Sequence, residues 1–188
     1  NHRTGLSPHP PRTHIVRTLF VLAPLTPEIV VATMLKLAAV RENDTVYDLG
    51  CGDGRIVITA AKDFKARRGL GLGFNPERLK GCEQRMKDEK LTDAQRKKLE
   101  FKRGDVLKLT PEAFKGGHVV TLYLYPPVNL RLMPVLKNGL KPASRVVSHD
   151  FKMGTWKEDK KEVVRYTKGG RERSAEVFLW VITKDDKA

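Results

Sequence analysis

The stretch Asp48-Leu49-Gly50-Cys51-Gly52-Asp53-Gly54 decides the fold of this chain. Residues 45–49 are typical of a β-strand, and residues 55–64 have the small and apolar side chains of a buried helix. Glycines at every second position allow a tight turn and leave the backbone open to a ligand. The order strand, glycine loop, helix therefore predicts a cofactor site, with a merely structural turn as the alternative.

The spacing of the glycines indicates which ligand the loop suits. The dinucleotide pattern G-x-G-x-x-G places its last glycine for a pyrophosphate at a helix N-terminus. This chain instead has G-x-G-x-G, and Asp48 precedes it. An acid at that position suits a cationic, amine-bearing ligand such as S-adenosylmethionine.

Strands and helices alternate along the rest of the chain. Further strands are predicted at residues 70–74, 99–102, 118–125 and 144–148, and helices after Thr26 as N-cap, after Asn75 and over residues 128–140. Residues 162–167 and 175–183, joined through Gly169-Gly170, predict a hairpin. The predicted fold class is α/β: a Rossmann-like, mostly parallel seven-stranded sheet flanked by helices, with a C-terminal antiparallel hairpin.

The charge of the chain is unusual for its length. Its 188 residues contain 36 Lys and Arg against 22 Asp and Glu, a formal net charge of +14. This excess favours acidic partners such as nucleic acid, an anionic membrane surface or a larger acidic or RNA-containing assembly, although a generally basic surface is the plain alternative. Residues 1–14 are expected to form an extended basic arm, followed by a single domain over residues 15–188.

The chain has few cysteines and no long apolar segment. Cys51 and Cys82 form neither a disulfide framework nor a metal-ligand pattern, so no metal is expected. The apolar stretch 19–25 is far below the roughly 20 residues that span a bilayer, so no transmembrane segment is expected. No acid precedes Glu28, which suits the remainder of an organelle-targeting segment and a mitochondrial location, with a cytoplasmic one as the alternative.

Several stretches resemble one methyltransferase family. Tyr47-Asp48-Leu49-Gly50-Cys51-Gly52-Asp53-Gly54-Arg55-Ile56-Val57-Ile58 resembles motif I of the seven-β-strand class I methyltransferases. The similarity continues in Leu122-Tyr123-Leu124-Tyr125-Pro126-Pro127-Val128-Asn129-Leu130, Val146-Val147-Ser148-His149-Asp150-Phe151 and Val177-Phe178-Leu179-Trp180. Over about residues 24–182, the chain resembles the prokaryotic and mitochondrial protein-lysine methyltransferases that include the enzymes for the ATP synthase c-subunit and the adenine nucleotide translocase.

The resemblance implies a cofactor and its contacts. The residues implied around the methionine and ribose portion of S-adenosylmethionine are Asp48, Gly50, Cys51, Gly52 and Gly54. Asp105 would lie beside the adenine, with Val106 against its face.

One position departs from the family pattern. Such enzymes usually carry Asp or Glu at the end of the second strand, where the carboxylate binds the ribose hydroxyls, and this chain has Gly73 there. Losing charge-assisted hydrogen bonds costs about 1.5–3 kcal/mol per bond, so weaker cofactor binding is expected. Asn75 is either a substitute hydrogen-bonding group or the N-cap of the helix that Pro76 begins.

The candidate catalytic residues follow the fourth and fifth strands. Methyl transfer needs alignment, a desolvated channel and a neutral amine. Tyr125 is favoured over Tyr123 to flank a lysine, with a core role as the alternative for both. Asn129 either orients the amine or caps a helix. His149 is a candidate proton acceptor; its neighbour Asp150 should point to the opposite side of an extended segment, and a purely structural role fits equally well.

Together these features predict an S-adenosylmethionine-dependent methyltransferase that acts on a lysine of a protein substrate. One alternative is a catalytically weakened methyltransferase fold with a structural or assembly role in a larger complex, for which Gly73 and the net charge argue. Another is an RNA methyltransferase, which rests on charge alone.

Overall fold

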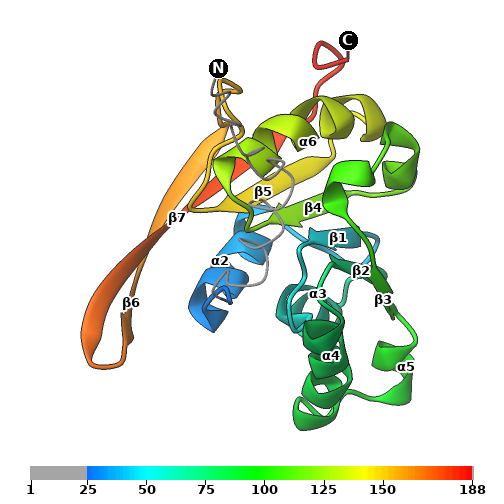
Figure 1. Cartoon of the computed structure of the whole chain (residues 1–188), viewed down its shortest axis with the longest axis vertical. Coiled ribbons are helices and arrows are strands. Elements are labelled where there is room, and N and C mark those ends of the chain that lie inside the picture. The colour runs from blue at the N-terminus through cyan, green and yellow to red at the C-terminus, as the bar shows by residue number, and fades with distance from the viewer. Residues whose placement is uncertain (1–24, 188) are drawn as a thin grey trace, which may run out of the picture.

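The computed structural model describes residues 25–187, so the predicted basic arm over residues 1–14 lies outside the described residues. The strands of the described chain form one seven-stranded sheet in the order β3-β2-β1-β4-β5-β7-β6 (Figure 1). The strands are β1 (Thr45–Leu49), β2 (Arg68–Gly73), β3 (Leu99–Arg103), β4 (Val119–Leu122), β5 (Arg145–His149), β6 (Lys160–Lys168) and β7 (Arg171–Val181). Strands β1 to β5 pair in parallel, whereas β7 pairs antiparallel with β5 and β6. The predicted fold class is confirmed.

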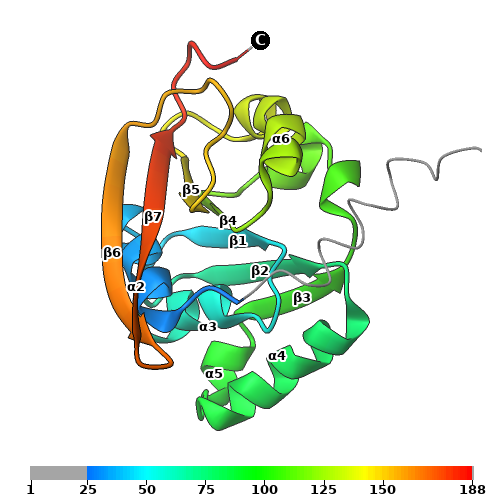
Figure 2. The same cartoon turned by 60° about the vertical axis from the view of Figure 1, so that its left-hand side comes forward.

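Helices cover the two faces of the sheet unequally (Figure 2). One face carries α2 (Glu28–Leu37), α3 (Arg55–Lys62) and α4 (Pro76–Asp88), and α5 (Asp93–Arg96) follows α4. The other face carries α6 (Pro126–Gly139) and two short 3-10 helices, η1 (Val106–Lys108) and η2 (Pro111–Phe114). Two main apolar cores result, one under α2 and α3 and one under α6, and a smaller cluster of Ile58, Met86 and Leu91 lies between α3 and the end of α4. Within residues 25–187, no helix is long and apolar enough to cross a bilayer.

Several predicted boundaries differ from the structure by one to four residues, and two of these differences have a local cause. The fourth strand ends at Leu122 instead of Tyr125, because its partner β1 ends at Leu49 and Gly50 then turns the chain away at φ +89°. The first described helix begins at Glu28, and its N-cap is Pro27. Thr26 does not cap this helix, because its hydroxyl lies 3.3 Å from Nδ1 of His149.

The C-terminal hairpin is confirmed and is longer than predicted. Strands β6 and β7 meet at a two-residue turn in which Gly169 and Gly170 have φ values of +58° and +71°. Both values lie in the left-handed region that such a hairpin turn requires and that glycine adopts without strain. Because β7 lies between β5 and β6, the hairpin extends the parallel sheet by two antiparallel strands.

A buried ion pair joins the amino ends of β1 and β5. A guanidinium nitrogen of Arg145 lies 2.6 Å from the Asp44 carboxylate, and both side chains are almost fully buried. Asp44→Asn leaves the Arg145 charge buried without its counterion, so we expect the free energy of unfolding to fall by about 3–5 kcal/mol in urea titrations. The matched control is Glu42→Gln in the same loop, whose ion pair with Lys65 is exposed. An equal effect of both substitutions would contradict this account.

Candidate active site

A cleft of about 710 Å³ lies at the carboxyl ends of β1, β2 and β4. In open parallel sheets, ligands bind at this edge, where the strand order reverses. The lining comes from the segment before α2, the glycine loop, the end of β2 with the start of α4, and the end of β4. Its residues are Leu25, Thr26, Asp48, Gly50, Cys51, Gly52, Arg55, Ile56, Gly73, Phe74, Asn75, Arg78, Tyr123 and Leu124.

The glycine loop has the conformation that its sequence predicts. Gly50, Gly52 and Gly54 all have positive φ, at +89°, +56° and +78°. The backbone nitrogens of Gly50 and Cys51 both donate to the carbonyl of Leu72, at 2.8 and 3.0 Å, which fixes the loop to β2. A Cβ on Gly50 would lie 2.8 Å from Leu124, so the loop also needs the space that glycine leaves.

The three glycines do not share one role. Gly50 and Gly52 line the cleft, whereas Gly54 is not among the lining residues. A Cβ on Gly54 would lie 2.6 Å from the ring of Phe101 and 3.1 Å from Sγ of Cys82. Gly54 therefore packs beneath the loop, and its contact with the cofactor stays a prediction.

Asp48 is a buried carboxyl group at the floor of the cleft. Its residue is 3% exposed, and the hydroxyl of Thr121 donates to its Oδ1 at 2.9 Å. Burial raises the pKa of Asp48 to about 7, while the Thr121 hydrogen bond acts in the opposite direction and the Asp53 charge raises it further. A cationic ligand beside this carboxylate would favour the charged form. The observation fits the predicted amine-bearing cofactor.

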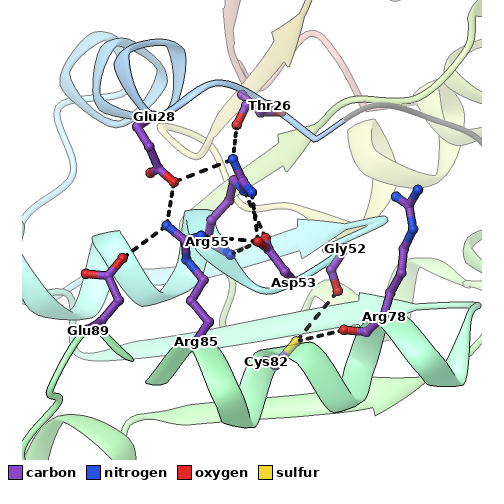
Figure 3. Close-up of polar contacts among 9 residues, drawn as sticks. All are labelled: Thr26, Glu28, Gly52, Asp53, Arg55, Arg78, Cys82, Arg85 and Glu89. Carbon is purple, nitrogen blue, oxygen red and sulfur yellow. Dashed lines mark hydrogen bonds and ion pairs between the residues drawn. The ribbon is translucent and has the colours of Figure 1, made fainter. Parts of the chain in front are cut away.

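Asp53, which the glycine motif also contains, forms ion pairs with two arginines of the protein (Figure 3). Arg55 and Arg85 both pair with its carboxylate, at 2.8 and 3.2 Å. Burial raises the pKa of Asp53, but these two guanidinium groups hold it below its ordinary value. Arg85 also pairs with Glu28, and Arg55 donates to the carbonyl of Thr26, so the network joins α2, the glycine loop and α4.

The end of β2 differs from the family pattern as the sequence indicates. Gly73 lines the cleft without a side chain, and a Cβ there would lie 3.0 Å from Leu79 and 3.4 Å from Sγ of Cys51. Asn75 is the N-cap of α4, because its Oδ1 accepts hydrogen bonds from the backbone nitrogens of Glu77 and Arg78. Asn75 nevertheless borders the cleft, as does the Arg78 side chain, which the sequence analysis missed.

Cys51 fills space between the loop and β2. It is 4% exposed, and a Cβ on Gly71 would lie 3.0 Å from its Sγ. Its interaction with Cys82 and its burial raise the pKa of the Cys51 thiol far above the ordinary range, so the thiol stays neutral. Cys51 therefore contributes shape to the cleft wall and no charge. Among residues 25–187, no group of side chains has the composition of a metal site.

Tyr123, not Tyr125, lies at the end of β4 in the cleft wall. Its ring stacks on that of His149, with centroids 3.9 Å apart. Nδ1 of His149 lies 3.3 Å from the Thr26 hydroxyl, and Nε2 lies 3.4 Å from the Asp150 carboxylate. The expectation that His149 and Asp150 point apart is wrong, because Asp150 has φ +59° and leaves the extended conformation.

His149 is held beneath the cleft wall and does not line the cleft. It is 2% exposed, and burial lowers its pKa although the Asp150 charge opposes this. The imidazole is therefore neutral at pH 7. The structure places His149 under Tyr123 as a positioning group, which favours the structural alternative over direct proton transfer.

The other two predicted catalytic residues also lie away from the cleft lining. Tyr125 is the N-cap residue of α6 and packs on Phe151, with ring centroids 5.5 Å apart. Asn129 is fully buried, and its Nδ2 donates to the carbonyls of Phe151 and Lys152. Asn129 thus positions the segment after β5, and its contact with a substrate amine stays a prediction.

The predicted adenine contacts lie after β3. Asp105 caps η1, accepting a hydrogen bond from the Leu107 nitrogen at 3.0 Å. Val106 is 4% exposed and belongs to the core under α6. Neither residue is among those lining the cleft, so their contact with adenine stays a prediction.

The residues present fit S-adenosylmethionine unevenly. The methionine end would meet the exposed backbone of Gly50 and Gly52 and the buried Asp48 carboxylate, whose charge complements a cation. The ribose end would meet Gly73, without the usual carboxylate, and the polar side chains of Asn75 and Arg78.

Gly73→Glu tests the ribose end. The new Cβ would press on the far end of the Leu79 side chain, which can move. We expect the affinity for S-adenosylmethionine, measured by isothermal titration, to rise about tenfold or more through charge-assisted hydrogen bonds to the ribose. Gly73→Gln is the control of equal length without charge, and we expect a smaller gain. Equal affinities of wild type and the Glu variant would show that other groups already hold the ribose, and no binding by either would favour the weakened-enzyme alternative.

Asp48→Asn tests the buried carboxyl group without any ligand. Because its pKa rises from 3.8 to about 7 on folding, the folded chain keeps a proton that the unfolded chain has lost. This stabilisation is present at low pH and is lost as the pH rises from about 4 to about 7. We expect the stability of wild type relative to the variant, measured by urea unfolding, to fall by about 2–3 kcal/mol between pH 5 and pH 8. A pH-independent difference would refute the raised pKa.

Comparison with known proteins agrees with this geometry. Residues 48–160 match the family model of the ANTKMT methyltransferase domain. A protein-lysine N-methyltransferase of Saccharolobus islandicus (strain REY15A) is 41% identical over 158 residues, which cover 84% of this chain and 91% of that protein.

Solved structures extend the comparison. An RNA methyltransferase from Salinibacter ruber, in complex with S-adenosyl-L-homocysteine, is 39% identical with a TM-score of 0.71, covering 86% of this chain and 95% of that chain. The precorrin-8w decarboxylase from Methanobacterium thermoautotrophicum, at 19% identity and a TM-score of 0.65 over 85% of this chain and 92% of that chain, shares the fold alone. The chain therefore belongs to the ANTKMT methyltransferase domain family and is an S-adenosylmethionine-dependent methyltransferase.

Proposed function

We propose that this methyltransferase acts on the amine of a lysine in a protein substrate. One observation carries the proposal: Tyr123 belongs both to the wall of the cofactor cleft and to an aromatic group with His149 and Phe151. Tyr125 also packs on Phe151. A lysine side chain needs such a corner, because its apolar stem and its cationic head both bind favourably to aromatic rings. The Saccharolobus relative, named for the same reaction, supports the proposal.

Tyr123 is suited to hold an amine without taking its proton. Burial raises the pKa of Tyr123 to about 12, and the Asp150 charge acts in the same direction, so the phenol stays protonated at neutral pH. Its oxygen can accept a hydrogen bond from the lysine nitrogen, and its ring face can attract the ammonium form. Tyr123 therefore orients the nucleophile.

The reaction requires a neutral amine, because the ammonium ion has no lone pair. When bound, S-adenosylmethionine supplies a sulfonium-linked methyl group and its own leaving group. Removal of the lysine from water lowers its pKa, whereas the ring faces favour the ammonium form, so the proton must pass to solvent before methyl transfer. Tyr123 would hold the lysine lone pair toward the methyl group that the cofactor would supply from its sulfonium, with S-adenosylhomocysteine as the leaving group. No protein side chain needs to act as a strong base.

Two further residues keep this corner in shape. His149 supports the Tyr123 ring from below and is itself held between Thr26 and Asp150. Asn129 fixes the backbone of Phe151 and Lys152. They are positioning residues in the proposed reaction, and this explains why both occur in the stretches that resemble the family.

Tyr123→Phe tests the proposal, with Tyr125→Phe as the matched control. The full chain is incubated with S-adenosylmethionine and a set of lysine-containing proteins, and methylated lysines are identified by mass spectrometry. Loss of one hydrogen bond to the reacting amine should lower kcat about tenfold for Tyr123→Phe, with little change for Tyr125→Phe. Equal losses in both variants would contradict the assignment of Tyr123.

The same assay includes RNA as the competing acceptor. The Salinibacter relative is an RNA methyltransferase, and the present chain carries a net charge of +14. Methylation of RNA with no modified lysine would overturn the proposed substrate class. Modified lysine with unmodified RNA is the expected result.

A further inference from the structure

The helices of residues 25–187 cover the face of β1, β2 and β3 opposite α3 and α4 incompletely (Figure 2). A crossover between parallel strands usually carries an α-helix that covers the sheet. Between β3 and β4, the described chain has only η1 and η2, of three and four residues. Leu70 and Leu72 on this face are consequently half-buried.

This uncovered face forms a groove with an apolar floor. The groove has a volume of about 790 Å³, and its lining includes Tyr47, Leu49, Leu70, Leu72, Arg68 and Lys102. A second hollow of about 820 Å³, at the amino ends of β1 and β2, shares Tyr47 and Arg68 with it. We call the two together the β1–β3 groove.

Cations surround the β1–β3 groove. The lining of the second hollow contains Arg67, Arg68, Lys97, Lys98 and Lys115. Glu100 pairs with Arg68 and Lys102, and Glu112 lies near Lys115. Within residues 25–187, Lys97, Lys98 and Lys115 form no ion pair. The rim therefore keeps an excess of positive charge beside the half-buried Leu70 and Leu72.

We infer that the β1–β3 groove docks an acidic amphipathic segment of a partner protein. Apolar side chains of that segment would cover Leu70 and Leu72, and its carboxylates would meet the rim lysines. Recognition of an amphipathic segment combines burial of an apolar stripe with complementary charge at the rim. A purely apolar ligand would leave the rim lysines unpaired, and a purely acidic one would leave the leucine floor uncovered.

Charge and chemistry disfavour the other occupants. A second copy of this chain also carries +14, so the two copies would repel. Residues 1–24 contain arginines and no acid, so they do not complement the rim. Nucleic acid would satisfy the cations, but single-stranded bases bind to exposed aromatic faces, and the floor here is mainly aliphatic.

The groove is separate from the cofactor cleft. Leu70, Lys97, Lys98 and Lys115 are absent from the cleft lining, and the cationic second hollow lies at the opposite ends of the strands. The inference therefore does not depend on which substrate is methylated. Changes at these positions should leave cofactor binding intact, which provides a test of folding for every variant.

Three fluorescein-labelled probes of equal negative charge test the inference on the full chain. They are a helical peptide with leucines at i, i+3, i+4 and i+7 and glutamates elsewhere, a glutamate-only peptide, and an oligouridylate. Fluorescence anisotropy should show that the amphipathic peptide binds at least about tenfold more tightly than the other two, because only it buries the leucine floor. Equal or tighter binding of the glutamate-only peptide or of RNA would overturn the proposal.

Substitutions locate the binding site. The triple variant Lys97→Glu, Lys98→Glu, Lys115→Glu should weaken binding of the amphipathic peptide about tenfold or more. The matched control reverses three lysines near and on β6, Lys157→Glu, Lys160→Glu and Lys168→Glu, and should change affinity less than about twofold. Similar losses in both triple variants would show nonspecific attraction to a basic protein and would refute the groove.

Leu70→Gln tests the apolar floor. It should weaken binding of the amphipathic peptide about fivefold or more and leave the affinity for the glutamate-only peptide unchanged. Isothermal titration with S-adenosylmethionine verifies that each variant is folded. Analytical ultracentrifugation of wild type identifies self-association: a dimer that Leu70→Gln abolishes would show that a second copy fills the groove, contrary to the proposal.

Discussion

Two hydrogen bonds, from the backbone nitrogens of Gly50 and Cys51 to the carbonyl of Leu72, hold the glycine loop against β2. They are possible only because Gly50 has φ +89°, a conformation that a residue with a Cβ adopts at a cost. The loop in turn sets the floor of the cleft, the start of α3 and the end of β1. Every other feature of the site is arranged around this fixed turn.

Electrostatics then divide the acids of the glycine motif between two tasks. Asp53 is neutralised by Arg55 and Arg85 and joins the loop to the helices beside it. Asp48 has no cationic partner among the described residues and receives only the Thr121 hydroxyl, so burial keeps its pKa near 7. A bound sulfonium or ammonium group would stabilise the ionised form of this carboxyl group and lower its pKa. Ionisation of the buried Asp48 reduces the stability of the free chain at neutral pH, and a bound cation would offset this loss.

The two edges of the sheet carry different chemistry. At the carboxyl edge, the glycine loop and Tyr123 bring a cofactor cleft and an aromatic corner together. Away from this edge, the short η1–η2 crossover leaves part of the opposite face as a groove with a cationic rim. Part of the positive charge of the chain thus lies beside apolar surface. Positive charge alone favours any polyanion, whereas a cationic rim beside an apolar floor favours an acidic protein segment with apolar side chains.

Local patterns in the sequence determined the strand–loop–helix unit, the glycine conformations and the terminal hairpin, because neighbouring residues decide each of these features. They left Asn75 open between a helix cap and a ribose-binding group. The family departure at Gly73 was also visible there. Only the tertiary structure decided that Thr26 meets His149 across 123 positions, that Asn129 turns toward the backbone after β5, and that Tyr123 replaces Tyr125 in the cleft wall. These outcomes depend on where β1 ends and on which helix packs above each strand. Contacts between distant segments leave no periodicity or spacing from which the sequence alone can predict them.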